Sequence, residues 1–363
     1  MSGAAAPPRP SGLDDPAELA RRDPGGMLGE VARAGDQARD ALQAAQAAPL
    51  VGPLPEVVVV AGMGGSGIAG DVLAALAFGG SAVPVLTAKG DRLPGFVGPG
   101  TLLIAVSYSG DTAETLSAVE QGLAAGARLV AVTSGGTLAR LAGARRAPLV
   151  TVAGGRKPRA ALWSLVVPVC SAAEAAGVLP PLTDQVCAAA DALDEEAARL
   201  GPAVATADNP AKQAARRLLD RLPVVWGSGP LGAVAATRFR TQGNENAKVS
   251  VVSAALPEAN HNDVMGLEGG LDPDRELVLL RDPAGEHDRD PRRIRAVLEA
   301  IGADDPVQRL AGDGPGLARL ARLTAFADFT TTYLGIARGV DPTPIRTLDQ
   351  VKAALSAEPR SPR

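Results

Sequence analysis

The segment Val57–Asp71 constrains the fold more than any other part of the chain. Four consecutive valines, Val57–Val60, predict a short buried β-strand, and a run of glycines follows almost at once. The apolar residues after these glycines recur at helical spacing. A strand, a glycine loop and a helix in this order direct backbone N–H groups and the positive end of a helix towards an anion. The segment therefore predicts an α/β fold with an anion site after its first strand.

The glycine spacing also raises the question of a dinucleotide cofactor. Gly62, Gly64 and Gly67 satisfy the G-x-G-x-x-G pattern, which alone is a weak signal. A dinucleotide fold needs an acidic residue at the end of its second strand, where Asp91 is a candidate. It has no use, however, for the loop rich in serine and threonine that follows the third predicted strand. We therefore expect no cofactor, and keep a nicotinamide-dependent enzyme as an alternative that cofactor binding would reveal.

The loop Ser107–Thr112 directly follows the predicted strand 102–106 and carries three hydroxyl groups close to the start of a helix. Asp111 and Glu114 have the spacing of a capping pair, so we expect the helix to begin near Thr112. Ordinary helix capping explains one hydroxyl but explains three poorly. Hydroxyls gathered at a positive helix end favour a phosphate monoester as the ligand. The three hydroxyl residues are Ser107, Ser109 and Thr112.

Alternating strands and helices continue through the chain and then begin again. Apolar strands separated by helices predict a parallel sheet with helices on both faces. The strand 224–226, the glycine loop 227–232 and a helix to about residue 242 repeat the first arrangement, and a further strand is expected at 249–252. We expect two tandem units of flavodoxin-like or Rossmann-like three-layer architecture. The predicted segments are an N-terminal tail with one or two lead-in helices (1–48), a first domain (49–205, with a linker at 201–210), a second domain (206–345) and a C-terminal helix and tail (346–363).

Composition excludes several classes of function. A net charge of −4 and only 2% aromatic residues give no basic footprint or stacking platform for nucleic acid. No apolar run approaches the length of a membrane span, and residues 1–12 lack the apolar segment of a signal peptide. Two histidines, His261 and His287, are too few for a histidine-rich metal site. We expect a soluble cytoplasmic protein that binds neither nucleic acid nor membrane.

Six segments together resemble the bifunctional phosphoglucose/phosphomannose isomerases, which consist of two sugar isomerase (SIS) domains. The segments are AGMGGSGIAGDVL, SYSGDTAETL, VTSGG, KPRAALWS, GNENAK and NHND, and the resemblance runs from about residue 55 to the C-terminus. It implies a metal-free aldose–ketose isomerase that acts on six-carbon sugar phosphates such as mannose 6-phosphate, glucose 6-phosphate and fructose 6-phosphate. It also implies a homodimer in which His261 completes the site of the partner subunit.

The resemblance implies individual roles as well. The residues that would hold the phosphate are Gly65, Ser66, Ser107, Ser109 and Thr112, and those that would act in catalysis are Arg159, Glu245, His261 and Lys352. Glu245 would be the base, Arg159 would stabilise the enediolate, and His261 with Lys352 would assist ring opening. A hydroxyl that bears on selectivity between glucose and mannose corresponds to Thr343 or to Thr347.

Without the resemblance, each catalytic candidate has an ordinary structural alternative. Glu245 could also be a solvated glutamate at the end of a helix. Arg159 could be a surface arginine close to two other cations. His261 also fits a capping or buried histidine, and Lys352 an exposed lysine on an amphipathic helix. The functional alternative is a sugar-phosphate sensor, which would use the same loops but would not need the set of Glu245, His261 and Arg159.

Overall fold

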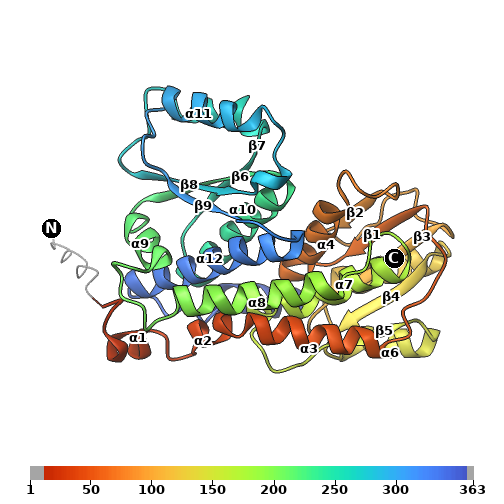
Figure 1. The fold of residues 1–363 in the computed structure, drawn as a ribbon. Helices are drawn as coiled ribbons and strands as arrows, with labels where there is room; N and C mark the ends of the chain where they lie inside the picture. The colour runs from red at the N-terminus through yellow and green to blue at the C-terminus, as the bar shows by residue number, and fades with distance from the viewer. Residues whose placement is uncertain (1–11, 358–363) are drawn as a thin grey trace.

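The computed structural model describes residues 12–357, apart from the side chains of residues 352, 353 and 355–357. Two parallel β-sheets, each flanked by helices, form the molecule (Figure 1). The α/β prediction with two parallel sheets in tandem is therefore confirmed. The first sheet contains β1 (Val57–Ala61), β2 (Val85–Ala88), β3 (Thr101–Val106), β4 (Arg128–Thr133) and β5 (Leu149–Thr151); the second contains β6 (Leu222–Ser228), β7 (Val252–Leu256), β8 (Arg275–Arg281) and β9 (Val307–Leu310).

Both sheets reverse their strand order at one point. The order is β2-β1-β3-β4-β5 in the first sheet and β7-β6-β8-β9 in the second, and every pair is parallel. The chain therefore leaves β1 on one side and returns on the other to form β3, and β6 and β8 repeat this pattern. Such a switch point opens a crevice at the carboxyl ends of the two strands, which is where open α/β sheets bind ligands.

Helices cover the sheets and also connect them. The α-helices are α1 (Pro16–Arg22), α2 (Met27–Ala32), α3 (Ala34–Ala47), α4 (Gly64–Ala77), α5 (Ala113–Ala124), α6 (Gly136–Arg145), α7 (Leu162–Ala175), α8 (Thr183–Leu200), α9 (Pro210–Arg217), α10 (Pro230–Gln242), α11 (Asp290–Ala300), α12 (Gly316–Ala337) and α13 (Arg346–Ala357). The shorter helical turns are η1 (Pro158–Ala160), the π turn η2 (Gly243–Ala247), η3 (Glu258–Asn260), η4 (Asp263–Leu267) and η5 (Pro283–Gly285).

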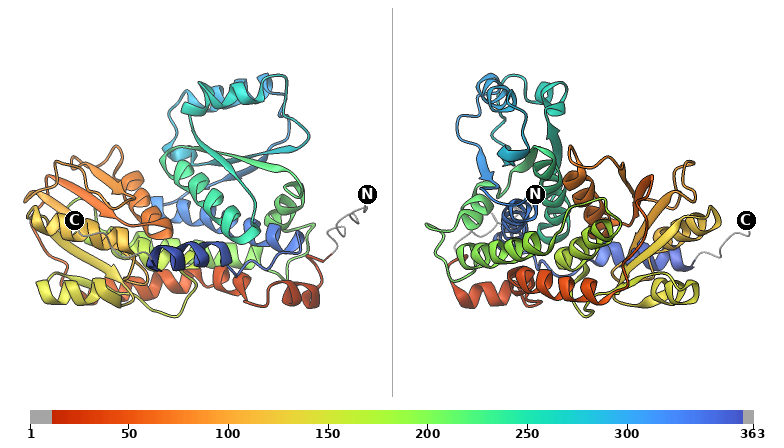
Figure 2. Two further views of the ribbon diagram at one scale, coloured as in Figure 1. Left: turned by 180° about the vertical axis from the view of Figure 1, so that it is seen from behind. Right: turned by 45° about the vertical axis from the view of Figure 1, so that its right-hand side comes forward.

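The helix α12 joins the two hydrophobic cores. Its first turns place Leu317 and Leu320 in the core of the first sheet, and its later turns place Phe326 and Phe329 in the core of the second. Nearly the whole circumference of α12 is buried from Leu323 to Ala337, and the buried residues include threonines and Asp328 as well as apolar side chains. Helices α8 and α12 pack against each other below the second sheet, and α3 packs against α8 along the lower side of the molecule (Figures 1 and 2).

Three local predictions differ from the structure. The β-branched run 249–252 is mostly not a strand: β7 spans Val252–Leu256, because its pairing with β6 begins at Val224 opposite Val252. The predicted linker 201–210 differs by one residue only: α9 begins at Pro210, where the Asn209 side chain accepts from the N–H groups of Ala211 and Lys212. The lead-in segment contains three helices, where one or two were expected.

Two further points concern the ends and surface of the chain. Nearly all of the tail predicted at residues 1–12 lies outside the described residues. Between residues 12 and 357, no helix combines the length and the apolar character needed to cross a membrane.

Replacing Leu320 with alanine tests the joining role of α12. Leu320 is fully buried, so the substitution removes packing atoms and leaves a cavity. We expect the free energy of unfolding, measured by urea titration, to fall by about 2–5 kcal/mol. Leu310, whose side chain is 45% exposed on β9, provides the control, with an expected change within about 0.5 kcal/mol for Leu310→Ala. Equal effects of the two substitutions would contradict this description of the core.

Candidate active site

The loops after β1 and β3 lie side by side at the first switch point. Strands β1 and β3 pair in parallel, with Ala61 opposite Ala105, so their carboxyl ends meet at one edge. Gly62 permits this approach, since an added Cβ would lie 3.0 Å from the Val106 carbonyl oxygen. Helix α4 begins in the first loop without a side-chain cap, and Ser66 is buried in its first turn. The start of α4 therefore remains available to an anion.

Hydrogen bonds fix the conformation of the second loop. Ser107 Oγ and Thr112 Oγ1 are 2.9 Å apart, and the Gly110 N–H donates to Ser107 Oγ at 3.1 Å. Ser109 is exposed, and its Oγ accepts from the Asp111 N–H at 3.3 Å. Gly110 has a φ of +76°, and an added Cβ would lie 1.9 Å from the Gly135 carbonyl oxygen. Only glycine fits there, so this residue sets the shape of the loop.

The predicted capping role of Asp111 is wrong for its own helix. Thr112 is the N-cap of α5, and no side chain caps that helix. Asp111 Oδ1 instead accepts from the Thr137 N–H at 2.9 Å and from the Thr137 hydroxyl at 2.7 Å, in the first turn of α6. These hydrogen bonds hold the pKa of Asp111 below its ordinary value of 3.8. The positive end of α5 is thereby left without a side-chain cap, although Glu114 lies in its first turn.

Tyr108 ties the second loop to the segment that carries Arg159. Its hydroxyl donates to the Ala153 carbonyl at 3.0 Å and accepts from the Arg156 N–H at 3.0 Å. The first loop reaches the same segment, since a Cβ built on Gly65 would lie 3.8 Å from the Pro158 carbonyl oxygen. Sequence reasoning assigned no role to Tyr108. A single aromatic residue inside a polar loop, in a chain with two tyrosines, was the available signal.

Arg159 is buried, with 7% of its surface exposed, so it is not a surface arginine. Its Nε donates to Asn246 Oδ1 at 2.9 Å, and its Nη2 donates to the carbonyl oxygens of Pro342, at 2.6 Å, and Thr343. Its Nη1 lies 3.7 Å from Glu245 Oε2. Burial lowers the pKa of the Arg159 guanidinium, and the charge of Glu245 opposes that shift.

Glu245 lies on the π turn η2, directly after α10. Its side chain is 35% exposed, so it is half-buried rather than fully solvated. Lys248 closes the turn, and its Nζ donates to the carbonyl oxygens of Glu245 and, at 3.2 Å, Pro342. Burial and the nearby Arg159 lower the pKa of Lys248. Single π turns inside helices recur at functional sites, because the extra residue redirects one side chain.

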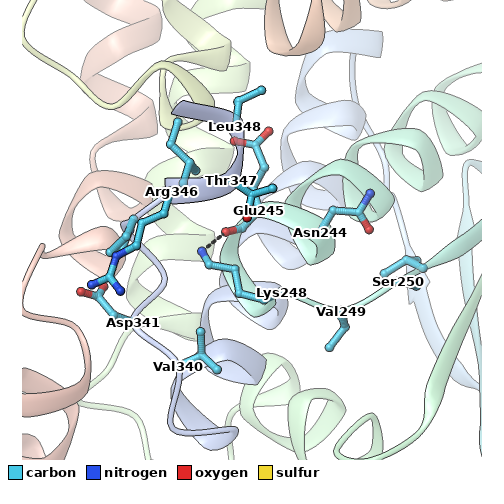
Figure 3. A pocket seen from close by; sticks show the side chains of 13 residues that line it. Asn244, Glu245, Lys248, Val249, Ser250, Val340, Asp341, Arg346, Thr347 and Leu348 are labelled. Atoms are coloured by element: carbon cyan, nitrogen blue, oxygen red, sulfur yellow. Dashed lines mark hydrogen bonds between the residues drawn. The ribbon is translucent and has the colours of Figure 1, made fainter. Parts of the chain in front are cut away.

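A pocket of about 800 Å³ opens beside Glu245 (Figure 3). It lies between residues 244–251, after α10, and residues 340–348, which lead into α13. Thr347 lines this pocket. Thr343 faces elsewhere: its carbonyl binds Arg159, and its hydroxyl lies 2.1 Å from the position of a Cβ built on Gly25. Of the two candidate threonines, Thr347 is therefore the one with access to the pocket.

Neither of the other two predicted catalytic residues is among the described side chains that line this pocket. His261 is exposed, follows η3 beyond the end of β7, and does not line the pocket. Lys352 lies on α13, but its side chain is outside the described residues. Within the chain, the structure thus brings Arg159 and Glu245 together and leaves His261 at the surface.

The second switch point has a different chemistry. The residue after β8 is Asp282, whose carboxylate is buried. The residue at the equivalent position after β3 is Ser107. Arg319 Nε donates to Asp282 Oδ1 at 2.7 Å and closes this position with an ion pair. A carboxylate here disfavours a phosphate group through like charge. In the described part of the chain, no three His, Cys, Asp or Glu side chains gather as a metal ion would require.

Comparisons with known proteins agree with this arrangement. A family model described as the bacterial phospho-glucose isomerase C-terminal SIS domain matches residues 207–355. The bifunctional phosphoglucose/phosphomannose isomerase of Caldicellulosiruptor bescii is 33% identical over 82% of this chain and 89% of its own length. That of Thermoplasma acidophilum is 34% identical over 82% and 89%. In fold, a glucose-6-phosphate isomerase like protein from Thermus thermophilus aligns with a TM-score of 0.61 and 23% identity, covering 94% of this chain and 98% of that one.

Replacing Asp111 with asparagine tests the cap that reaches from the second loop to α6. The amide keeps the Oδ1 acceptor for Thr137 and loses only the negative charge at the positive end of α6. Because the folded pKa of Asp111 is lowered, its stabilising charge is present above the ordinary value of 3.8 and is lost as the pH falls through the folded pKa. We expect Asp111→Asn to have a lower melting temperature than the wild type near pH 7 and the gap to close in acid. A gap that stays constant from pH 7 to pH 2 would contradict this role.

Proposed function

Because the chain belongs to the bifunctional phosphoglucose/phosphomannose isomerase family, we propose that it interconverts mannose 6-phosphate and glucose 6-phosphate with fructose 6-phosphate. The protein is an isomerase, and its named relatives define the substrates that we propose for it. The observation that carries the proposal is the pairing of Arg159 Nη1 with Glu245 Oε2 at 3.7 Å, in which Glu245 also lines the 800 Å³ pocket. A carboxylate and a cation side by side are the two groups that this reaction requires.

The reaction proceeds through a cis-enediol. Glucose and mannose 6-phosphates differ only in configuration at C2, so loss of the C2 proton gives one common enediol. Glu245 takes this proton and returns it to C1, while the hydroxyl proton passes from O2 to O1, which yields the ketose. Arg159 stabilises the negative charge that develops on the substrate oxygens. One half-buried carboxylate is sufficient for both proton transfers, because both carbons present the same face of the planar intermediate.

The phosphate binds at the first switch point. The starts of α4 and α5 have no side-chain caps, which supports an anion held by backbone N–H groups there. The groups proposed to hold it are Gly65 and Ser66 after β1, with the hydroxyls of Ser107, Ser109 and Thr112 after β3. Tyr108 and Pro158 connect these loops to Arg159, which supports a single substrate that spans both regions.

Catalysis is proposed to be independent of metal, because Arg159 supplies the fixed positive charge beside the base. Ring opening, which precedes isomerisation, is assigned to His261 and Lys352. The pocket position of Thr347 supports this residue, rather than Thr343, as the hydroxyl that bears on selectivity between glucose and mannose.

The competing function is a sugar-phosphate sensor without turnover. A sensor needs the phosphate loops, but it has no requirement for a carboxylate beside a buried guanidinium. The distance between Arg159 and Glu245 therefore favours the enzyme. A coupled assay on both aldose phosphates, with and without a chelator, tests the proposal. Turnover that the chelator leaves unchanged is expected, and binding of either aldose without turnover would favour the sensor.

Replacing Glu245 with glutamine tests the base directly. The amide has nearly the same shape but cannot accept the proton, so substrate binding should persist. We expect exchange of the C2 proton with solvent deuterium, followed by nuclear magnetic resonance, to fall by at least a factor of about 10². Affinity for the sugar phosphate, measured by calorimetry, serves as the control for folding and binding. Exchange at a rate near that of the wild type would remove Glu245 from the mechanism.

Subunit complementation tests the proposed homodimer. His261 is exposed and outside its own chain's pocket, which supports its action on a partner subunit. In a two-fold dimer, mixing Glu245→Gln chains with His261→Ala chains creates one site with both defects and one intact site. We expect each parent to be nearly inactive and each mixed dimer to regain about half of the wild-type activity. No recovery, with mixed dimers demonstrated by mass spectrometry, would contradict a role in the partner's site.

A further inference from the structure

A buried ion pair lies behind Arg159, between α10 and α12. Arg238 on α10 donates from Nε and Nη2 to the two carboxylate oxygens of Asp328 on α12, each at 2.8 Å. The Arg238 Nη2 also donates to the main-chain carbonyl of Arg159 at 2.6 Å. Arg238 is 2% exposed and Asp328 is 9% exposed. The pair is therefore directed at a single backbone atom of the candidate active site.

Two further side chains on the same helix face close a ring around Arg159. Gln242 Nε2 donates to the Arg159 carbonyl at 2.9 Å, beside Arg238. Gln242 Oε1 accepts from Asn246 Nδ2 at 3.1 Å, and Asn246 Oδ1 accepts from Arg159 Nε at 2.9 Å. Gln242 and Asn246 are both buried, with 2% and 1% of their surface exposed. The ring thus fixes both the main chain and the guanidinium of Arg159.

The spacing of these residues explains how the ring also fixes Glu245. Arg238, Gln242 and Asn246 follow one another at intervals of four residues, so they share one face of α10 and its π turn. Glu245 immediately precedes Asn246 in the π turn. Any movement of Asn246 away from Arg159 therefore also moves Glu245.

We propose that Arg238, Asp328, Gln242 and Asn246 are positioning residues, which hold Arg159 and the π turn bearing Glu245 in the geometry that the reaction requires. The proposal rests on the roles proposed above for Arg159 and Glu245. None of the four needs to contact the substrate. A buried ion pair is often replaceable by apolar side chains without loss of stability, so stability alone is a weak reason for this pair.

The double substitution Arg238→Met with Asp328→Leu distinguishes two roles of the ion pair: positioning Arg159, and only holding α10 against α12. It removes both buried charges together, keeps similar volume, and leaves the Arg159 carbonyl with one side-chain donor instead of two. Displacement of reacting groups by about 1 Å can cost a factor of about 10² in rate. We expect kcat to fall at least tenfold and KM to change less than threefold, because the phosphate loops are untouched.

The matched control is a second buried ion pair in the same half of the chain. Arg319 and Asp282 pair at 2.7 Å, and neither lines the pocket beside Glu245. We expect Arg319→Met with Asp282→Leu to keep kcat within twofold of the wild type. A folded Arg238→Met, Asp328→Leu variant with wild-type kcat would overturn the proposal, as would equal losses in the two double variants.

A single near-isosteric change covers the case in which the double variant fails to fold. Gln242→Met removes the second donor to the Arg159 carbonyl and the acceptor for Asn246, and leaves the ion pair intact. A kcat at least tenfold lower at unchanged KM supports positioning, and a wild-type kcat in this folded variant overturns it.

Amide hydrogen exchange of residues 243–247 gives a readout that does not depend on turnover. Positioning predicts faster exchange across the π turn in Gln242→Met, with unchanged exchange in the Arg319→Met, Asp282→Leu control. Unchanged exchange in Gln242→Met would count against the proposal. If the wild-type protein shows no isomerase activity, the proposed function fails, while exchange still tests whether the ring holds the turn.

Discussion

The burial of Arg159 is the constraint on which the site depends. A guanidinium with 7% of its surface exposed requires hydrogen-bond acceptors and a compensating charge, because a buried unpaired cation is costly. Its acceptors are the side-chain oxygen of Asn246 and the carbonyl oxygens of residues 342 and 343. The compensating charge is the carboxylate of Glu245. Segments far apart in the sequence must therefore meet at one point. This requirement brings the carboxylate of Glu245 beside the cation.

The two halves of the chain share a topology but not a chemistry. Each sheet has a switch point, yet the loop after β3 presents hydroxyls and the end of β8 presents Asp282. At the second switch point, the carboxylate of Asp282 is paired with the guanidinium of Arg319. At the first position, α5 starts without a side-chain cap, and Asp111 binds the first turn of α6 instead. The residue at each strand end thus differs in chemistry, a hydroxyl at the proposed anion site and a paired carboxylate at the second switch point.

Sequence periodicity predicted the elements whose signal is local. The valines of β1, the apolar run of β3 and the glycine loops led to the prediction of parallel sheets, because strand and loop patterns depend on neighbouring residues. The strand order and its switch points were not predicted, since they depend on contacts between distant segments. The pairing of Arg159 with Glu245 could not be found in this way, since their contact follows from tertiary packing across α10, η1 and residues 342–343. The Val249–Val252 prediction failed for a related reason. The register of β7 is set by its pairing with β6, and residues 248–251 connect the π turn to the start of β7.

The position of Arg159 also depends on the N-terminal segment, although the sequence of this segment contains no recognisable motif. Arg22 Nη1 donates to the Ile336 carbonyl at the end of α12 at 3.0 Å, and Lys157 Nζ donates to the Gly25 carbonyl at 2.5 Å. Thr343 packs directly against Gly25, where no other residue has room for its Cβ. Because Arg159 binds the carbonyl of Thr343, the position of the guanidinium depends on a segment that precedes the whole first sheet. The segment before that sheet therefore supports the candidate active site through Gly25.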